Sequence, residues 1–327
     1  MRNWYLPVLG CFFLLVGSGV AAAEKIRVGV VSPAPGLSAP WIAKDAGIFT
    51  KHGLDADVIL LTGSPRLVQS LIAGDVDFAL VGSTAAMRAR MRGAEIAILA
   101  AATNVSSQKV LVNPKSGIRK LEDLKGRVVG VSQYGSEADS FARIAVSKVG
   151  LRADKDVTIL QLGGHPQVAA ALIAGKLDAG VIGGLAYVTA KKSGAIVLAS
   201  AVDLKTVSLG PVITVTRNYM QQKRDTVMRF MRSFVEAIDY FKTNRDGTIP
   251  ILQKTMGGIS AENARFLYDE YLELFEELPV PKEEGLQAAL ERESDPKAKS
   301  FKPADFVDLS FLKEIDRSGL VEKLYRK

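Results

Sequence analysis

The sequence predicts an α/β protein of two lobes, each built around a largely parallel sheet. From Ile26 to Ser200, short apolar runs alternate with amphipathic stretches, which is typical of βα units. The same pattern recurs with one constant offset of 101 positions. With 327 residues, of which 48% are hydrophobic, the chain is long enough to bury two cores.

The first half of the chain contains four predicted strands. The strand at residues 26–31 runs into a Pro/Gly/Ser loop, and Ser38-Ala39-Pro40-Trp41 then predicts a helix start. A second helix is expected to begin at Ser64-Pro65 and to end near Gly74. The remaining strands are predicted at residues 58–61, 77–81 and 96–101.

The repeat is carried by glycines, a proline and apolar runs at matched positions. They are Leu71-Ile72-Ala73-Gly74 with Leu172-Ile173-Ala174-Gly175, Asp77 with Asp178, Gly82 with Gly183, Gly63 and Pro65 with Gly164 and Pro166, and residues 28–30 with residues 129–131. Two repeats cannot build a solenoid, so we expect two similar lobes that face each other.

The lobes are expected to be discontinuous in sequence. Residues 110–112 and 212–215 are extended runs on either side of the second repeat, and we interpret them as strands that carry the chain out of the first lobe and back. The predicted divisions are residues 24–111 for the first part of lobe I, 112–212 for lobe II, and 213–327 for the return and a C-terminal helical extension. Helices are expected there at residues 225–242, 264–277 and 311–325, with a polar loop at 295–303.

The N-terminus predicts an exported protein. Arg2, the apolar residues 6–16 and the three alanines up to Ala23 have the layout of a secretory signal, removed by cleavage after Ala23. A retained anchor is one alternative, and a lipoprotein at Cys11 is another, although cutting there would leave the apolar residues 12–15 on the mature protein. Cys11 is the only cysteine, so the mature chain is expected to have no disulfide and no thiolate metal site.

The charge pattern excludes nucleic acid as an expected partner. Lys and Arg number 42 and Asp and Glu 35, a formal net charge of +7, but the two signs are interspersed without a basic run. No segment after the signal has membrane-spanning length. We therefore expect a soluble, monomeric protein.

Enzyme motifs are missing from the sequence. No nucleophile elbow, phosphate loop or metal-protease motif occurs, and the only histidines are His52 and His165, without ligand-like spacing. His52 is expected to be a solvated residue at a helix exit. The prediction is no catalytic residue, no cofactor and no metal.

Small polar residues recur where a predicted strand passes into a helix. In an open parallel sheet such junctions lie at the carboxyl ends of the strands, where ligands bind, and helix N-termini suit an anionic or strongly polar ligand. Plain helix capping is the alternative explanation. The residues at these junctions are Ser38, Ser64, Ser83, Thr84, Ser136 and His165.

Other candidates lie in or near the same loops. Trp41 and Tyr134 could stack on a ligand or belong to the core, and Asn104 could add an amide donor and acceptor. Arg66 is the nearest fixed positive charge and is expected to point into solvent. Whether Arg66 or His165 contacts ligand stays open at this point.

Several runs together resemble a known family. They are residues 43–49 and 51–54, residues 71–79 with Gly82-Ser83-Thr84, residues 121–126, and residues 178–180. In these runs the chain resembles the periplasmic substrate-binding proteins of ABC importers, in the nitrate, sulfonate, taurine and thiamine-precursor branch. The resemblance covers nearly all of the chain after the signal.

The resemblance implies a type II periplasmic-binding fold, with two α/β lobes, a two-strand hinge and the ligand between the lobes. Ligand would select a closed form that the membrane permease and its ATPase recognise. Family contacts would fall on Ser38, Gly63, Ser64, Ser83, Thr84, Tyr134 to Glu137 (including Ser136), Gly164 and His165. The expected ligand is a small anion or polar organic acid, such as an alkanesulfonate, taurine or nitrate.

Two alternatives to import remain. One is a sensory ligand-binding protein that docks to a receptor. The other is an enzyme on the same fold, which would need an acid such as Asp77, Asp178 or Glu137 in the cleft. The cysteine-rich motif of the thiamine-precursor binders and the histidines of the related synthases are absent from the chain after Ala23, which argues against pyrimidine binding of that kind and against synthase activity.

Overall fold

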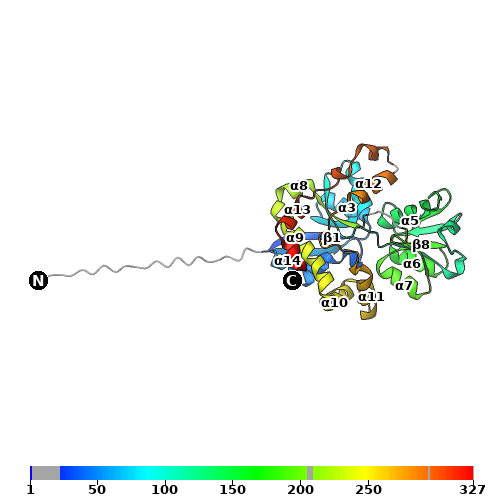
Figure 1. Ribbon diagram of the computed structural model, residues 1–327, viewed down its shortest axis with the longest axis horizontal. Coiled ribbons are helices and arrows are strands. Elements are labelled where there is room, and N and C mark those ends of the chain that lie inside the picture. Colours follow the sequence, from blue (N-terminus) through cyan, green and yellow to red (C-terminus); the bar gives the residue numbers. More distant parts are fainter. Residues whose placement is uncertain (2–22, 205–208, 294, 327) are drawn as a thin grey trace.

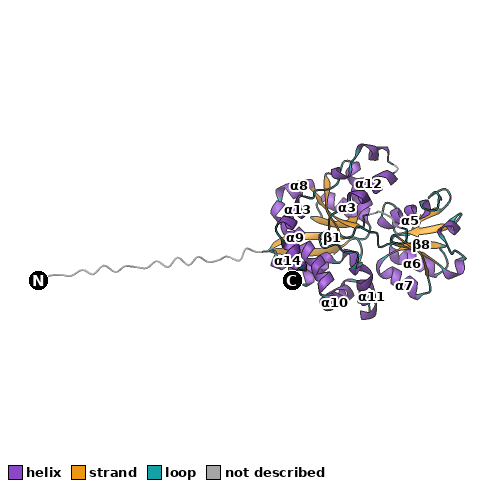
Figure 2. Ribbon diagram, viewed as in Figure 1, coloured by secondary structure: helices purple, strands orange, loops and turns teal. Residues whose placement is uncertain are grey.

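The computed structural model describes residue 1 and residues 23–204, 209–293 and 295–326. All of the predicted signal except its first and last residues lies outside the described residues. The rest forms two α/β lobes that lie side by side, with helices packed around a sheet in each (Figures 1 and 2). The predicted two-lobed α/β class is confirmed.

Lobe I contains a five-stranded sheet in the order β2-β1-β3-β10-β4. Strands β1, β2 and β3 are parallel, and β10 is antiparallel to its two neighbours, β3 and β4. The strands are β1 (Glu24–Val30), β2 (Leu54–Leu60), β3 (Phe78–Gly82), β4 (Ile96–Ala101) and β10 (Pro211–Thr216). Strand β2 corresponds to the strand predicted at residues 58–61 but starts four residues earlier, because its alternating buried and exposed side chains continue back to Leu54.

Lobe II repeats this topology in the order β7-β6-β8-β5-β9, with β5 as the antiparallel strand. Its strands are β5 (Lys109–Val112), β6 (Val128–Val131), β7 (Thr158–Gln161), β8 (Ala179–Ile182) and β9 (Ile196–Ser200). Each strand of one sheet therefore has a counterpart at the same position in the other sheet, as the sequence repeat predicts.

Helices cover both faces of each sheet. Along β3, Phe78 and Leu80 point into one apolar cluster while Ala79 and Val81 point into another, because successive side chains of a strand face opposite ways. The helices between strands are α1 (Ala39–Asp45), α2 (Ile48–Lys51), α3 (Ser64–Ala73), α4 (Ser83–Met91), α5 (Glu137–Ser147), α6 (His165–Ile173) and α7 (Gly184–Lys192).

The matched aspartates of the repeat have the same structural role in both lobes. The Asp77 carboxylate accepts the backbone N–H of Arg27 (2.7 Å), and the Asp178 carboxylate accepts that of Val128 (3.1 Å). Each aspartate, placed just before β3 or β8, thereby binds the backbone of the neighbouring strand, β1 or β6. Both groups are used structurally.

The chain crosses between lobes earlier than the predicted divisions. Leu111 and Val112 are paired with β8 and β9, so all of β5 belongs to lobe II, and β10 belongs entirely to lobe I. The crossings are residues 102–108 and 201–210, so two chain segments connect the lobes, and their described parts lie outside the strands of both sheets. Two backbone hydrogen bonds join the crossings: Ala102 N donates to Pro211 O (2.7 Å) and Gly210 N to Thr103 O (3.0 Å).

The C-terminal extension packs on lobe I, as Figure 1 shows. Its helices are α8 (Arg217–Gln222), α9 (Arg224–Thr243), α10 (Arg245–Thr255), α11 (Ala261–Leu272), α12 (Glu283–Arg292), α13 (Ser310–Arg317) and α14 (Leu320–Tyr325). The single helix predicted at residues 311–325 is broken at Gly319, whose φ of 71° is left-handed. Among the helices of the described segments, none combines the length and the apolarity needed to cross a membrane.

His52 is not the solvated residue that the sequence predicts. Its Nε2 lies 2.9 Å from the Glu236 carboxylate on α9, and its side chain is mostly buried. The partner is remote in sequence, so local pattern could not indicate it.

The paired aspartates provide a test of the repeat. Replacing Asp77 by Ala should lower the free energy of unfolding by about 1–2 kcal/mol, because the Arg27 backbone N–H loses its acceptor and the Arg27 side chain loses its ion pair. Asp178→Ala should lower the free energy of unfolding by less, because the Asp178 side chain is 31% exposed against 14% for Asp77. Its hydrogen bond is also longer. Urea unfolding measures both, with the exposed Asp55→Ala as control. Equal, negligible losses at both aspartates would contradict this role.

Candidate functional site

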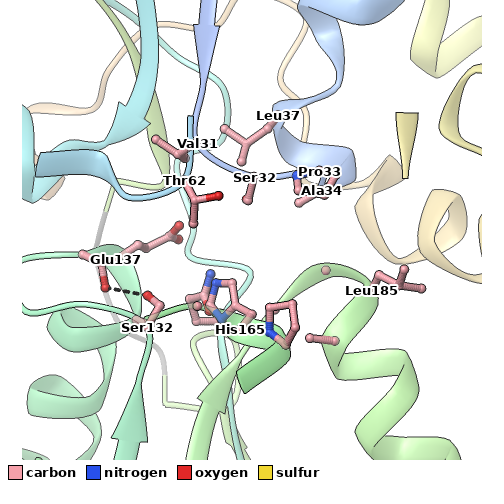
Figure 3. A pocket seen from close by; sticks show the side chains of 18 of the residues that line it. Val31, Ser32, Pro33, Ala34, Leu37, Thr62, Ser132, Glu137, His165 and Leu185 are labelled. Carbon is pink, nitrogen blue, oxygen red and sulfur yellow. Dashed lines mark hydrogen bonds between the residues drawn. The ribbon is translucent and has the colours of Figure 1, made fainter. Parts of the chain in front are cut away.

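A cavity of about 500 Å³ lies between the lobes, at the carboxyl ends of the parallel strands. Figure 3 shows Val31, Ser32 and Thr62 coming from lobe I on one side and Ser132 and His165 from lobe II on the other. In sheets of this kind the loops that follow the strands carry the ligand site. The size is that of pockets that hold small organic molecules, roughly 300–1,000 Å³.

Half of the predicted site residues line this cavity. They are Gly63, Ser64, Ser136, Glu137, Gly164 and His165. Four of them form two pairs matched by the repeat, Gly63-Ser64 and Gly164-His165, at the N-termini of α3 and α6. The equivalent loops of the two lobes therefore face each other across the cavity.

Ser83 and Thr84 line a small adjoining cavity of about 20 Å³ instead. The Ser83 hydroxyl donates to the Leu209 carbonyl (3.0 Å), and the Thr84 and Ser140 hydroxyls are 2.7 Å apart. Because Thr84 is on α4 of lobe I and Ser140 on α5 of lobe II, this bond connects the lobes. The pair is placed to hold the lobes together rather than to contact a ligand in the large cavity.

Four more predicted residues lie outside the cavity lining, and three of them use their polar atoms elsewhere. Ser38 Oγ donates to the Pro35 carbonyl (2.6 Å), and the Tyr134 hydroxyl donates to the Ile159 carbonyl (3.0 Å). The Asn104 amide donates to the Val280 carbonyl and accepts the backbone N–H of Lys282. Trp41 packs against the core of lobe I. Arg66, the open candidate, is exposed and does not line the cavity.

Glu137 is held by the first crossing. Ser106 Oγ donates to its carboxylate (2.8 Å), and the Ser107 backbone and the Gln108 side chain also donate to it. Burial nevertheless raises the pKa of Glu137 to about 7, because the loss of water costs the charged form more than these three donors return. Glu137 of lobe II is thus hydrogen-bonded to the first crossing, a segment about which the lobes would move.

His165 is neutral at pH 7, since burial lowers the pKa of its imidazole to about 4. Its contact with the Val181 backbone acts in the opposite direction, as a carbonyl does when it accepts a ring N–H. Its Nδ1 is buried and has no hydrogen-bond partner among the described residues. A neutral imidazole has one donor and one acceptor nitrogen, so we assign Nδ1 as a free acceptor.

Most of the lining was not predicted from sequence, and two of these residues have informative surroundings. Gln108, on the first crossing, is 6% exposed, and its Oε1 has no partner among the described residues. Tyr271, on α11 of the C-terminal extension, lies with its hydroxyl against the Ser107 side chain and the Gly184 backbone. Gln108 lies two residues before the predicted strand at 110–112 and directly precedes β5, but nothing in the local sequence connects Tyr271 with the site.

The lobes touch on both sides of the cavity. Gly184 of lobe II has a left-handed φ of 59°, and a Cβ there would lie 3.2 Å from the Ala34 Cβ of lobe I. Helix α11 also reaches lobe II, where Lys109 donates to the Glu270 carboxylate (2.8 Å) and Lys192 to the Asn263 side chain (2.6 Å). This arrangement encloses the space between the lobes.

The described lining carries almost no charge. Glu137 is its only acid, and it contains no lysine and no arginine. The described part of the chain also contains no group of three His, Cys, Asp or Glu residues able to hold a metal ion. What the walls offer is an apolar surface with a few hydrogen-bonding groups.

Comparisons with known proteins agree with this geometry. A family model described as "NMT1/THI5 like" matches residues 36–247. A protein of Brucella abortus (strain 2308) named as a binding protein is 30% identical over 256 residues, 77% of this chain and 78% of its own length. One of Bacillus subtilis (strain 168), named as an aliphatic sulfonates-binding protein, is 28% identical over 75% of this chain and 76% of its own.

Solved structures share the fold. The periplasmic aliphatic sulphonate binding protein SsuA from Escherichia coli superposes with a TM-score of 0.69 at 20% identity, covering 91% of this chain and 94% of its own. The expected two-lobed fold of periplasmic binding proteins is thereby confirmed.

The Glu137 environment predicts a pH dependence. A carboxyl with a folded-state pKa of about 7, above its ordinary 4.5, binds its proton more tightly in the folded state. Its contribution to stability therefore falls as the pH rises from about 4.5 to 7 and stays constant above. Relative to Glu137→Gln, the wild-type free energy of unfolding should fall by about 2 kcal/mol over this window.

Urea unfolding of both proteins at pH 5 and pH 8 measures this difference. His165 titrates with the opposite sign but is present in both proteins, so its effect cancels. The exposed Glu122→Gln is the matched control and should show no such change. A stability difference that is the same at both pH values would contradict the raised pKa.

Proposed function

The chain belongs to the NMT1/THI5-like family, and on that premise we propose that it is the extracytoplasmic solute-binding component of an ABC import system. The observation that carries the proposal is the cavity of about 500 Å³ whose walls come from equivalent loops of two lobes. A site divided between two lobes fills and empties when they move apart, which suits capture and release.

The two crossings are the hinge of this proposal. Through them the backbone of lobe II continues into the rest of the chain. They lie beside each other, joined by the Ala102–Pro211 and Gly210–Thr103 backbone hydrogen bonds. Rotation about two adjacent segments opens the cavity without disturbing either sheet. Ligand bound to both walls would favour the closed form, which a permease with its ATPase would then recognise.

The ligand class expected from the sequence, a small anion or polar organic acid, is supported by relatives named for aliphatic sulfonates. The helix N-termini of α3 and α6 at the cavity also favour negative charge. Export with cleavage after Ala23, a periplasmic location and a monomeric state belong to the same proposal. The family's binding proteins support it, although the signal itself lies outside the described residues.

A cavity-filling variant tests where the solute binds. Ala170 lines the cavity from α6 and is exposed, so Ala170→Trp should fill the space at little cost to folding. Solutes that raise the thermal midpoint of the wild type, sought among alkanesulfonates, taurine, nitrate, carboxylates and amides, should bind the variant at least about a hundredfold more weakly, ~2.7 kcal/mol.

The control is Ala174→Trp, since Ala174 is exposed at the end of α6 and does not line this cavity. Undiminished binding by Ala170→Trp would place the solute elsewhere. Delivery is tested in proteoliposomes that contain a candidate ABC permease with its ATPase. The loaded protein should stimulate ATP hydrolysis, and failure to do so while ligand still binds would favour the sensory alternative.

A further inference from the structure

The cavity between the lobes has two ends of different chemistry. Figure 3 shows Thr62, Ser132 and Glu137 toward one side of the view and Ala34 and Leu185 toward the other. Polar and apolar side chains are thus separated along the cavity. A ligand that fills it has to be polar at one end and apolar at the other.

The polar end lies where the first turns of two helices meet. A Cβ on Gly82 would lie 3.2 Å from Ser64 Oγ and 3.4 Å from the Glu137 backbone nitrogen. Because Ser64 is the first residue of α3 in lobe I and Glu137 the first of α5 in lobe II, both helix N-termini are close to Gly82. Their partial positive charges favour a negative group.

Hydroxyl protons are available at this end. Ser64 Oγ accepts the backbone N–H of Gly82 (3.0 Å), which leaves the Ser64 proton to be donated. The Ser132 and Ser136 hydroxyls are 3.0 Å apart and use one of their two protons for each other, so one remains. A hydrogen bond given to an anion is about twice as strong as one between neutral groups. We call this region the hydroxyl end (Thr62, Ser64, Ser132 and Ser136).

Glu137 does not exclude an anion from the hydroxyl end. Its carboxylate is engaged by the first crossing, where Ser106, Ser107 and Gln108 donate to it. Because burial raises the pKa of Glu137 to about 7, much of the protein carries a neutral carboxyl there at neutral pH. A bound anion favours this neutral form further, since a nearby negative charge raises a carboxyl pKa.

The other end of the cavity is apolar because α6 lies along it. Ala169, Ala170 and Ile173 share one face of this helix, three or four residues apart, and line the cavity. The equivalent helix α3 reaches the described lining only with its first residue, Ser64. The apolar wall therefore belongs to lobe II and is not repeated in lobe I.

Helix α7 and a loop of lobe I complete this wall. Leu185 follows Gly184, where a Cβ would lie 3.2 Å from the Ala34 Cβ. Thr189, one turn further along α7, gives its hydroxyl proton to the Leu185 carbonyl (3.2 Å) and so does not offer it to a ligand. We call this region the apolar end (Ala34, Leu37, Ala169, Ala170, Ile173 and Leu185).

The size of the cavity indicates how large the apolar part of the ligand is. A volume of about 500 Å³ holds roughly fifteen waters at about 30 Å³ each. A nitrate ion or a taurine molecule would leave much of this space filled with water. An apolar body that reaches along α6 would displace that water favourably.

We propose that the preferred ligand is an amphipathic organic anion, whose charged head lies at the hydroxyl end and whose apolar body, longer than that of taurine, lies along α6 at the apolar end. The inference rests on the proposed solute-binding function and narrows its ligand class. Ala170 and Ile173 then determine specificity for the body, and Thr62 contributes to binding of the head.

The test is a series of linear alkanesulfonates from ethanesulfonate to octanesulfonate, with taurine and nitrate alongside. They are added to the purified chain without its signal at pH 6.5, where sulfonates stay ionised. Thermal unfolding identifies binders, and calorimetry gives their dissociation constants. Each added methylene should tighten binding about fourfold until the cavity is filled, the effect of burying one such group.

Taurine and propanesulfonate form a matched pair within this test. They differ in their terminal group, which is an ammonium in taurine and a methyl in propanesulfonate. Propanesulfonate should bind at least about tenfold more tightly, because an ammonium group at the apolar end loses its hydration without an acidic partner there.

Variants at the apolar end assign the effect of chain length to α6. Ile173→Ser should weaken octanesulfonate at least about threefold and leave ethanesulfonate unchanged, because only the long chain reaches that residue. The matched control is Ile72→Ser at the equivalent position of α3, since Ile72 is 44% exposed against 41% for Ile173 and does not line the cavity. In Ala170→Trp the gain with chain length should disappear. A gain that persists there would mean that the chains bind outside the cavity, and the proposal would be overturned.

A variant at the hydroxyl end tests the position of the head. Thr62→Val should weaken every member of the series by about the same factor, roughly tenfold, because each has the same head and loses the same hydrogen bond. Thr158→Val, an equally exposed change on the edge strand β7, should leave all of them unchanged. A loss that grows with chain length in Thr62→Val would place the body, not the head, at that end and overturn the orientation.

The outcomes separate this inference from the function on which it rests. If taurine or nitrate binds as tightly as the longer alkanesulfonates, the apolar body is wrong while solute binding stands. If no anion of the series shifts the midpoint of protein that unfolds cooperatively, the ligand class is overturned, and the solute-binding proposal loses its support as well.

Discussion

The arrangement of this molecule depends on the place where two chain segments cross between the lobes. Each sheet receives its antiparallel strand from a chain that has just crossed, β5 in lobe II and β10 in lobe I. The crossings approach so closely that a Cβ on Gly210 would lie 2.1 Å from Thr103 Oγ1, so only glycine fits there. Both crossings lie at the same edge of the two sheets. For this reason the carboxyl ends of the parallel strands in one sheet face those in the other.

That constraint also sets the chemistry of the cavity. Residues 106–108 of the first crossing give three donors to Glu137 of lobe II, so the moving segment is tied to the N-terminus of α5. The acid takes the side-chain N–H of Gln108, whose buried oxygen has no partner among the described residues.

The two halves of the repeat are equivalent in backbone and different in chemistry. Ser64 and His165 occupy the same position in α3 and α6, yet Ser64 Oγ accepts the backbone N–H of Gly82 (3.0 Å), while His165 Nδ1 has no partner among the described residues. The C-terminal extension adds a further difference, since α11 brings Tyr271 to the cavity and no second copy of that helix exists in the repeat. Matched loops build the enclosure, and unmatched side chains give it specificity.

The sequence by itself determined the positions of most strands, the repeat, the two-lobed class and six residues of the cavity lining, because periodicity and strand-to-helix junctions are local properties. It placed Ser64, Glu137 and His165 at junctions that do face the cavity. Tertiary structure decided what local pattern cannot contain. Tyr134 and Asn104 lie at equally plausible junctions, but their polar atoms are taken by partners elsewhere, and Gln108 and Tyr271 enter the site only through the crossing and α11. The physical reason is that a hydrogen-bonding group becomes available to a ligand only when no other part of the folded chain satisfies it.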